Sequence, residues 1–119
     1  MMSSGVPSIS PSEAAAEVTS GAALIVDVRE DDEFVQERVE GAALVPLSTF
    51  RERYEELPKD QPLLMLCAAG SRSSSATMFL IQNGWTDVRN ITGGIIGWRA
   101  AGLPIREGPR APGEGDLPA

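Results

Sequence analysis

The stretch that decides the fold is Leu63-Leu64-Met65-Leu66-Cys67-Ala68-Ala69-Gly70-Ser71-Arg72-Ser73-Ser74-Ser75-Ala76. Its first four residues are all apolar, which is typical of a parallel strand buried on both faces. The only cysteine of the chain follows, and then come small residues and a helical pattern. In open α/β sheets, ligands bind beyond the carboxyl ends of the strands, so the pattern places Cys67 at a predicted ligand site.

The segment after Cys67 is typical of an anion-binding loop. Its small side chains allow the backbone N–H groups to turn inward and form a concave nest for an anion. A helix that begins near Arg72 directs its positive end to the same place, and Arg72 adds a permanent charge with a planar set of donors. In such settings the pKa of a cysteine falls from about 8.5 to roughly 3.5–7.5. We therefore predict that Cys67 is a thiolate nucleophile assisted by Arg72. The predicted substrate-binding residues are Ala68, Ala69, Gly70, Ser71, Arg72 and Ser73.

The chain contains no histidine, which excludes activation of Cys67 by a Cys–His pair. The loop, the helix end and Arg72 must therefore lower the pKa of the thiol. The alternative is an inert cysteine at the end of a core strand, because free cysteines are among the most buried residues. The glycine, serines and arginine that follow Cys67 favour the reactive interpretation.

Composition limits the classes of protein to consider. The 119 residues, 42% of them hydrophobic, fit one compact domain. A net charge of −7 argues against nucleic acid or an anionic membrane as a partner. One cysteine cannot form an internal disulfide, and without histidine neither a zinc site nor another metal or cofactor is expected. Because no signal peptide and no membrane-length apolar run is seen, we expect a soluble cytoplasmic protein.

Strand-like and helix-like segments alternate along the chain, which predicts βαβ units and a mainly parallel sheet with helices on both faces. We expect residues 1–7 to be a flexible N-terminus, residues 8–105 to form the domain, and residues 106–119, rich in Pro, Gly and charge, to be a disordered tail. The predicted strands are a short one at Ile9, 24–29, a short one within 41–46, 63–66 and 87–91. The predicted helices are 11–20 with a Ser10–Glu13 capping box, a short one that starts with the acidic residues 30–33, 48–57 with a Thr49–Glu52 capping box, 73–83, and 94–101.

Four residues outside the loop are predicted to support it. Asp27 interrupts an apolar strand, and we weigh a catalytic role against a buried acid paired with an arginine or with loop N–H groups; we favour the structural role, with Arg29 as support. Gly93 and Gly94 indicate a backbone segment that passes close to the Cys67 loop.

Residues 8–105 resemble a single-domain rhodanese, a family of sulfurtransferases. Each matching motif is weak by itself, but four in the right order over most of the chain are specific. The resemblance implies a rhodanese-like α/β fold with a five-stranded, mainly parallel sheet and helices on both faces. The motifs are Asp27-Val28-Arg29-Glu30 with Glu33-Phe34; Gly41-Ala42 with Pro46; Cys67-Ala68-Ala69-Gly70-Ser71-Arg72-Ser73; and Gly93-Gly94 with Trp98 and Gly102-Leu103-Pro104.

The resemblance also implies a reaction. The cysteine would take the outer sulfur of a donor such as thiosulfate, hold it as a persulfide, and pass it to cyanide or a thiol. One alternative is a non-catalytic sulfur carrier or docking module that takes its sulfur from a partner protein. Another is a phosphatase or arsenate-reductase activity. Four residues separate Cys67 from Arg72, whereas related loops of cell-cycle phosphatases are one residue longer, which argues against this second alternative.

Two departures from the family pattern affect these expectations. The family often has a histidine before the Gly-Ala pair, whereas this chain has Glu37-Arg38-Val39-Glu40 there. Either Arg38 replaces that histidine or the histidine is dispensable. Ala68 and Ala69 stand where some relatives carry basic or polar residues. The charge of the loop is then essentially Arg72 alone, and we expect thiosulfate to bind weakly.

Overall fold

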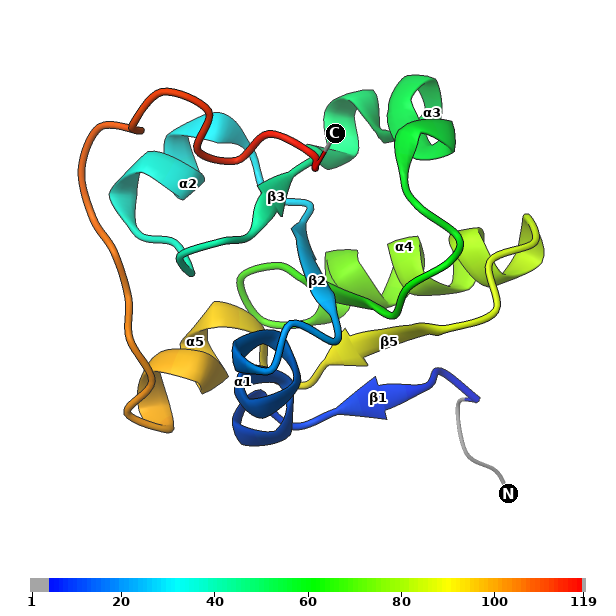
Figure 1. The fold of residues 1–119 in the computed structure, drawn as a ribbon, viewed down its shortest axis with the longest axis horizontal. Helices are drawn as coiled ribbons and strands as arrows, with labels where there is room; N and C mark the ends of the chain where they lie inside the picture. The colour runs from blue at the N-terminus through cyan, green and yellow to red at the C-terminus, as the bar shows by residue number, and fades with distance from the viewer. Residues whose placement is uncertain (1–4, 119) are drawn as a thin grey trace.

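The centre of the molecule is a five-stranded sheet with the strand order β1-β5-β4-β2-β3 (Figure 1). A computed structural model describes residues 5–118, and within that range every pair of neighbouring strands in this sheet is parallel. The predicted α/β fold with a mainly parallel five-stranded sheet is confirmed. The strands are β1 (Ser8–Ile9), β2 (Leu24–Asp27), β3 (Ala43–Leu44), β4 (Leu63–Leu66) and β5 (Val88–Ile91).

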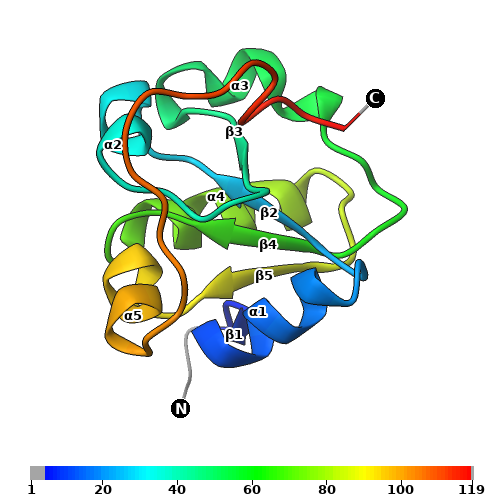
Figure 2. The same cartoon turned by 60° about the vertical axis from the view of Figure 1, so that its left-hand side comes forward.

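Helices cover both faces of the sheet (Figure 2). One face packs against α3 and α4, and the other packs against α1, α2 and α5. The connection between β3 and β4 also contains two 3₁₀ turns, Leu47–Thr49 and Tyr54–Glu56. The helices are α1 (Pro11–Thr19), α2 (Asp31–Gln36), α3 (Phe50–Arg53), α4 (Ser71–Gln82) and α5 (Gly94–Ala100).

Strand β4 lies at the middle of the sheet and is apolar at every position because both of its faces are covered. Leu63 and Met65 join the hydrophobic cluster under α3 and α4, while Leu64 and Leu66 join the cluster under α1, α2 and α5. All four side chains are fully buried. This alternation places Cys67, the next residue, on the same face as Met65, under α4.

The start of α1 follows the predicted capping box. The Ser10 hydroxyl accepts a hydrogen bond from the Glu13 backbone N–H, and the Glu13 carboxylate accepts one from the Ser10 backbone N–H. These bonds satisfy two groups that a helix end otherwise leaves without partners, so a short polar motif is enough to fix where α1 begins.

The predicted continuous helix 48–57 is wrong. The segment forms a 3₁₀ turn, the four-residue helix α3 and a second 3₁₀ turn. Thr49 makes no side-chain cap; its hydroxyl donates to the carbonyl oxygen of Pro46 instead. Phe50 and Tyr54 still share one face and pack on Phe79 of α4. The apolar periodicity therefore identifies the buried face of the segment, but it does not distinguish α from 3₁₀ geometry in so short a segment.

The C-terminal segment is not the disordered tail that its composition predicts. From the end of α5 it runs past α2 to the edge strand β3 (orange to red in Figures 1 and 2). The Leu44 backbone N–H donates to the Gly115 carbonyl at 2.7 Å, and Arg38 and Arg106 exchange two backbone hydrogen bonds of 2.8 Å. Leu117 packs against the core cluster beneath α3 and α4. Residues 106–118 thus cover the β3 edge of the sheet.

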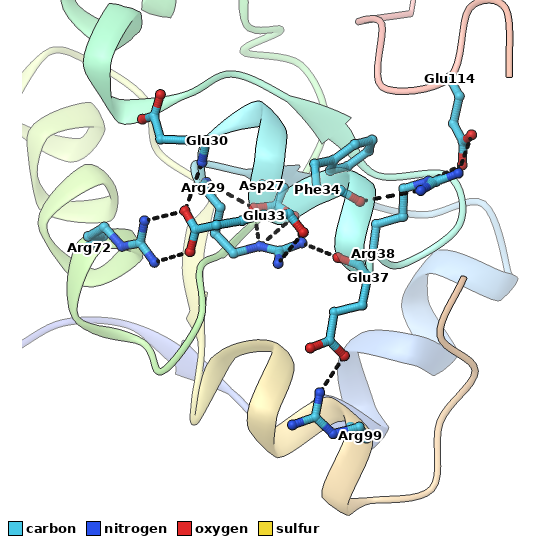
Figure 3. A network of polar contacts seen from close by, with 10 residues as sticks. All are labelled: Asp27, Arg29, Glu30, Glu33, Phe34, Glu37, Arg38, Arg72, Arg99 and Glu114. Carbon is cyan, nitrogen blue, oxygen red and sulfur yellow. Dashed lines mark hydrogen bonds and ion pairs between the residues drawn. The ribbon is translucent and has the colours of Figure 1, made fainter. Parts of the chain in front are cut away.

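Arg38 explains why a polar segment can pack here. Its side chain is 1% exposed, and its guanidinium donates to the Glu114 carboxylate and to the Phe34 carbonyl (Figure 3). It also donates to the carbonyls of Gly108 and Pro109. A buried guanidinium needs such acceptors, and the C-terminal segment supplies most of them. The amino-acid composition of the C-terminal segment does not indicate that its acceptors bind Arg38.

The N-terminal prediction is tested only in part. Residues 1–4, and Ala119 at the other end, lie outside the described residues. The carbonyl of Pro7 accepts a hydrogen bond from the Asn90 backbone N–H at 2.8 Å, so the chain is already tied to β5 at that point. Within residues 5–118, no helix combines the length and apolar character needed to cross a membrane.

Candidate active site

Cys67 follows β4 directly and lies at the carboxyl end of the sheet, beneath the first turn of α4. The loop turns at Gly70, whose φ of 109° is one that L side chains rarely adopt. Gly70 is also the N-cap of α4. Ala69 and Ser71 are exposed at the loop surface, whereas Ser73 is fully buried. The loop thus ends in a turn at Gly70, and the N-terminus of α4 packs over it.

Hydrogen-bond donors from the loop and from the start of α4 surround the sulfur of Cys67. The Gly70 backbone N–H lies 3.1 Å from Sγ, and the Ser73 hydroxyl oxygen lies 3.2 Å from it. Cys67 is only 1% exposed. Burial raises the pKa of its thiol, but the Ser73 hydroxyl and the backbone N–H groups of Ser73, Gly70 and Ala69 outweigh burial and lower the pKa overall. The cysteine is therefore buried, as the inert alternative requires, yet donors point at its sulfur.

Arg72 is held by a carboxylate instead of lying free in the loop. Its guanidinium makes a two-pronged ion pair with Glu33 of α2, with N–O distances of 2.8 and 2.9 Å (Figure 3). The bond from Arg72 lowers the pKa of Glu33 from 4.5 to about 2. Glu33 also raises the pKa of Arg72, to which a charged Cys67 adds a smaller contribution. The positive charge near the sulfur is therefore largely balanced by Glu33.

Asp27 and Arg29 form a buried ion pair on the face opposite Cys67. They are 0% and 2% exposed, and the closest approach of their side chains is 2.8 Å. Burial raises the pKa of Asp27, and the bonds from Arg29 act against this rise. The remaining Arg29 donors bind the carbonyls of Glu33 and Glu37 at the end of α2. This geometry fits a structural role, because the pair anchors α2 to β2.

Gly93 and Gly94 let the start of α5 approach the Cys67 loop. A Cβ atom at Gly94 would lie 2.4 Å from the Ala68 carbonyl oxygen and 2.5 Å from that of Cys67. The Ile95 backbone N–H donates to the Cys67 carbonyl at 2.9 Å, and the Ile96 backbone N–H donates to the Ala68 carbonyl at 3.1 Å. Because the loop carbonyls are bound by α5, the peptide units of the loop are fixed in orientation.

Sequence reasoning missed one residue of this site. Asn90 of β5 is 8% exposed and lies opposite Met65 in the neighbouring strand, on the face that carries Cys67. The Ser73 hydroxyl oxygen lies 2.6 Å from Asn90 Oδ1, and Asn90 Nδ2 lies 3.3 Å from the Gly70 carbonyl oxygen. The only signal in the sequence is an amide within the predicted strand 87–91. The partnership of Glu33 with Arg72 was also not foreseen, because the two lie far apart in the chain.

Comparison with known proteins agrees with this geometry. Residues 10–101 match the family described as Rhodanese-like domain. A sulfurtransferase of Allochromatium vinosum is 39% identical over 82 residues, which cover 69% of this chain and 77% of the relative. The thiosulfate sulfurtransferase GlpE of Actinobacillus succinogenes is 31% identical over 97 residues, covering 82% and 87% of the two chains.

A solved structure has the same fold. The crystal structure of a rhodanese-related protein from Thermoplasma volcanium superposes with a TM-score of 0.78 at 30% sequence identity. The superposition covers 84% of this chain and 97% of that one. The family match spans most of the chain and contains the Cys67 loop together with the glycines that support it. The sulfurtransferase relatives support an activity of the rhodanese type. The chain therefore belongs to the family of rhodanese-like domains.

Proposed function

We propose that this protein is a sulfurtransferase that moves a sulfane sulfur from a small donor to a thiophilic acceptor through a persulfide on Cys67. The observation that carries the proposal is the pair of hydrogen bonds from Gly70 and Ser73 to the sulfur of the only cysteine. A thiolate is the reactive form of cysteine, and these donors favour it.

In the first step the Cys67 thiolate attacks the outer sulfur of thiosulfate. A new S–S bond forms to Cys67, the S–S bond within thiosulfate breaks, and sulfite leaves with the bonding electron pair. The negative charge that was on the thiolate is now on the outer sulfur of the persulfide. N–H groups that are already oriented toward this region stabilise such charge without reorganising during the reaction.

In the second step cyanide or a thiolate attacks the outer sulfur of the persulfide. With cyanide the product is thiocyanate, and the electron pair of the broken S–S bond returns to Cys67 as a thiolate. No oxidant is consumed, because each step exchanges one S–S or S–C bond for another. Division of the transfer into two steps predicts ping-pong kinetics.

The Glu33–Arg72 pair sets how strongly an anionic donor can bind. Thiosulfate carries two negative charges, and a free guanidinium would attract it. In this chain Arg72 already binds Glu33 through two of its donors, and the two loop residues directly after Cys67, at positions 68 and 69, are alanines. We therefore expect thiosulfate to bind with a high KM through the remaining donors of Arg72 and the loop N–H groups.

The same pair favours a second candidate, a sulfur carrier loaded by a partner protein. A protein persulfide brings one negative charge in place of the two of thiosulfate, so it depends less on an unpaired arginine. The chemistry at Cys67 would be the same, and only the donor would differ.

A thiosulfate:cyanide assay tests the proposal. We expect steady thiocyanate production by the wild-type protein, none by Cys67→Ser, and a higher KM for thiosulfate in Arg72→Ala. Arg53→Ala is the matched control, because Arg53 also pairs with a carboxylate but lies on α3 away from the loop. Persulfide loading only from a protein donor would favour the carrier. Turnover by Cys67→Ser at the wild-type rate would refute the Cys67 mechanism.

A further inference from the structure

One side chain contacts both Ser73 and Gly70, two residues that donate hydrogen bonds to the sulfur of Cys67. The Asn90 carboxamide lies 2.6 Å from the Ser73 hydroxyl oxygen and 3.3 Å from the Gly70 carbonyl oxygen. Ser73 and Gly70 supply the hydroxyl and the N–H that reach Sγ. Asn90 comes from β5, whereas Ser73 and Gly70 belong to the loop and the start of α4. Asn90 thus ties the donors to the neighbouring strand of the sheet.

The Ser73 hydroxyl has one hydrogen and three acceptors within reach. They are Cys67 Sγ at 3.2 Å, Asn90 Oδ1 at 2.6 Å and the Gly70 carbonyl oxygen at 3.3 Å. Serines in the first turns of helices readily turn their hydroxyl to a local backbone carbonyl. Without a partner on β5, Ser73 would be free to rotate toward such an acceptor, and the sulfur would lose its hydroxyl donor.

A carboxamide suits this position in both protonation states of Cys67. In one orientation it accepts the Ser73 hydrogen; turned over, it donates its amino hydrogen to the Ser73 oxygen and leaves the hydroxyl hydrogen for the sulfur. A charged thiolate accepts a stronger hydrogen bond than a neutral amide oxygen does, so ionisation favours the second orientation. That orientation gives up the bond from Nδ2 to Gly70, which at 3.3 Å is the longer of the two.

We propose that Asn90 is a positioning residue that holds the Ser73 hydroxyl in place to donate to Cys67 Sγ. This inference rests on the proposed role of Cys67 as a thiolate nucleophile. It assigns no contact with substrate to Asn90, which acts through Ser73. The charged groups near the site are Arg72 with its partner Glu33, and Asp27 with its partner Arg29 on the opposite face of the sheet. Asn90 contacts none of them in the bonds described above.

The test is the pH dependence of Cys67 alkylation by iodoacetamide in the full chain. Asn90→Leu should raise the pKa of Cys67 and lower the alkylation rate about tenfold at a pH below the pKa. Ser73→Ala should raise it by at least as much. In the Ser73→Ala background, Asn90→Leu should add little. Asn83→Leu, at the exposed end of α4, is the matched control and should leave the profile unchanged.

The outcomes separate positioning from a purely structural role. An unchanged or lower pKa in Asn90→Leu, or an equal rise with and without Ser73, would overturn the inference, even if the thermal stability fell. If Asn90→Leu does not fold, Asn90→Ala removes the same carboxamide with less bulk and is tested in the same way. Because alkylation does not require sulfur transfer, a protein without thiosulfate turnover would refute the proposed function but leave this test intact.

Discussion

Gly94→Ala should destabilise the protein by pushing apart α5 and the Cys67 loop. The new Cβ atom would lie 2.4 Å from the Ala68 carbonyl oxygen and 2.5 Å from the Cys67 carbonyl oxygen. Both are backbone atoms, so a rotation of a flexible side chain cannot relieve the contact. The loop or the helix must move, and each is fixed by its own hydrogen bonds.

The magnitude follows from what that movement breaks. The bonds from the Ile95 and Ile96 backbone N–H groups to the two loop carbonyls would be lost, at about 1 kcal/mol each. The φ of +60° at Gly94 adds a cost of about 1–2 kcal/mol for any residue with a Cβ atom. We therefore expect the free energy of unfolding to fall by about 3–4 kcal/mol.

Gly102→Ala is the matched control for this experiment. Gly102 has a φ of +77°, but a Cβ atom there meets nothing within 4 Å. Only the backbone cost applies, so we expect a loss of about 1–2 kcal/mol. Urea unfolding followed by the fluorescence of the two tryptophans, Trp85 and Trp98, which are 5% and 3% exposed, measures both variants. Equal losses in Gly94→Ala and Gly102→Ala would refute the close approach of α5 to the loop.

Two further predictions concern the contacts of α2 with the loop and with the C-terminal segment. Glu33→Gln should cost about 1 kcal/mol at pH 7, since this partly exposed ion pair is screened by solvent. Because the folded-state pKa of Glu33 is lowered from 4.5 to about 2, that stabilisation is complete above about pH 4.5 and is lost as the pH falls toward 2. Urea midpoints of Glu33→Gln and wild type should therefore converge in acid, and a constant difference would contradict the ion pair. Deletion of residues 106–119 should lower the free energy of unfolding by about 3 kcal/mol, because it removes the three backbone hydrogen bonds that join the segment to Leu44 and Arg38, at about 1 kcal/mol each; an unchanged midpoint would mean that the segment does not pack.

Local patterns predicted the parts of the structure that depend on local chemistry. The four apolar residues 63–66 identified the central strand, and Ser10 with Glu13 marked the start of α1. The glycines at 93–94 indicated a close approach that the structure places at the Cys67 loop. In each case the local backbone conformation or the burial of the position requires a particular residue type, so the local sequence is enough to predict the feature.

Features that depend on partners distant in the chain were missed. The C-terminal segment looked disordered because its binding depends on one buried arginine at position 38 and on backbone bonds. The charge of the loop is predicted to be essentially that of Arg72 alone, yet Glu33 from α2 balances it. Asn90 of β5 makes a hydrogen bond with Ser73 of α4. None of these pairings leaves a periodic or compositional pattern, because each is created only when the chain folds.

Intact-protein mass spectrometry before and after incubation with thiosulfate tests the central claim most directly. The account predicts that the wild-type protein gains one sulfur atom, that fragmentation places it on Cys67, and that cyanide removes it. Cys67→Ser should gain nothing. An unchanged mass after thiosulfate and after any persulfide donor, or a sulfur atom located away from Cys67, would contradict the persulfide mechanism.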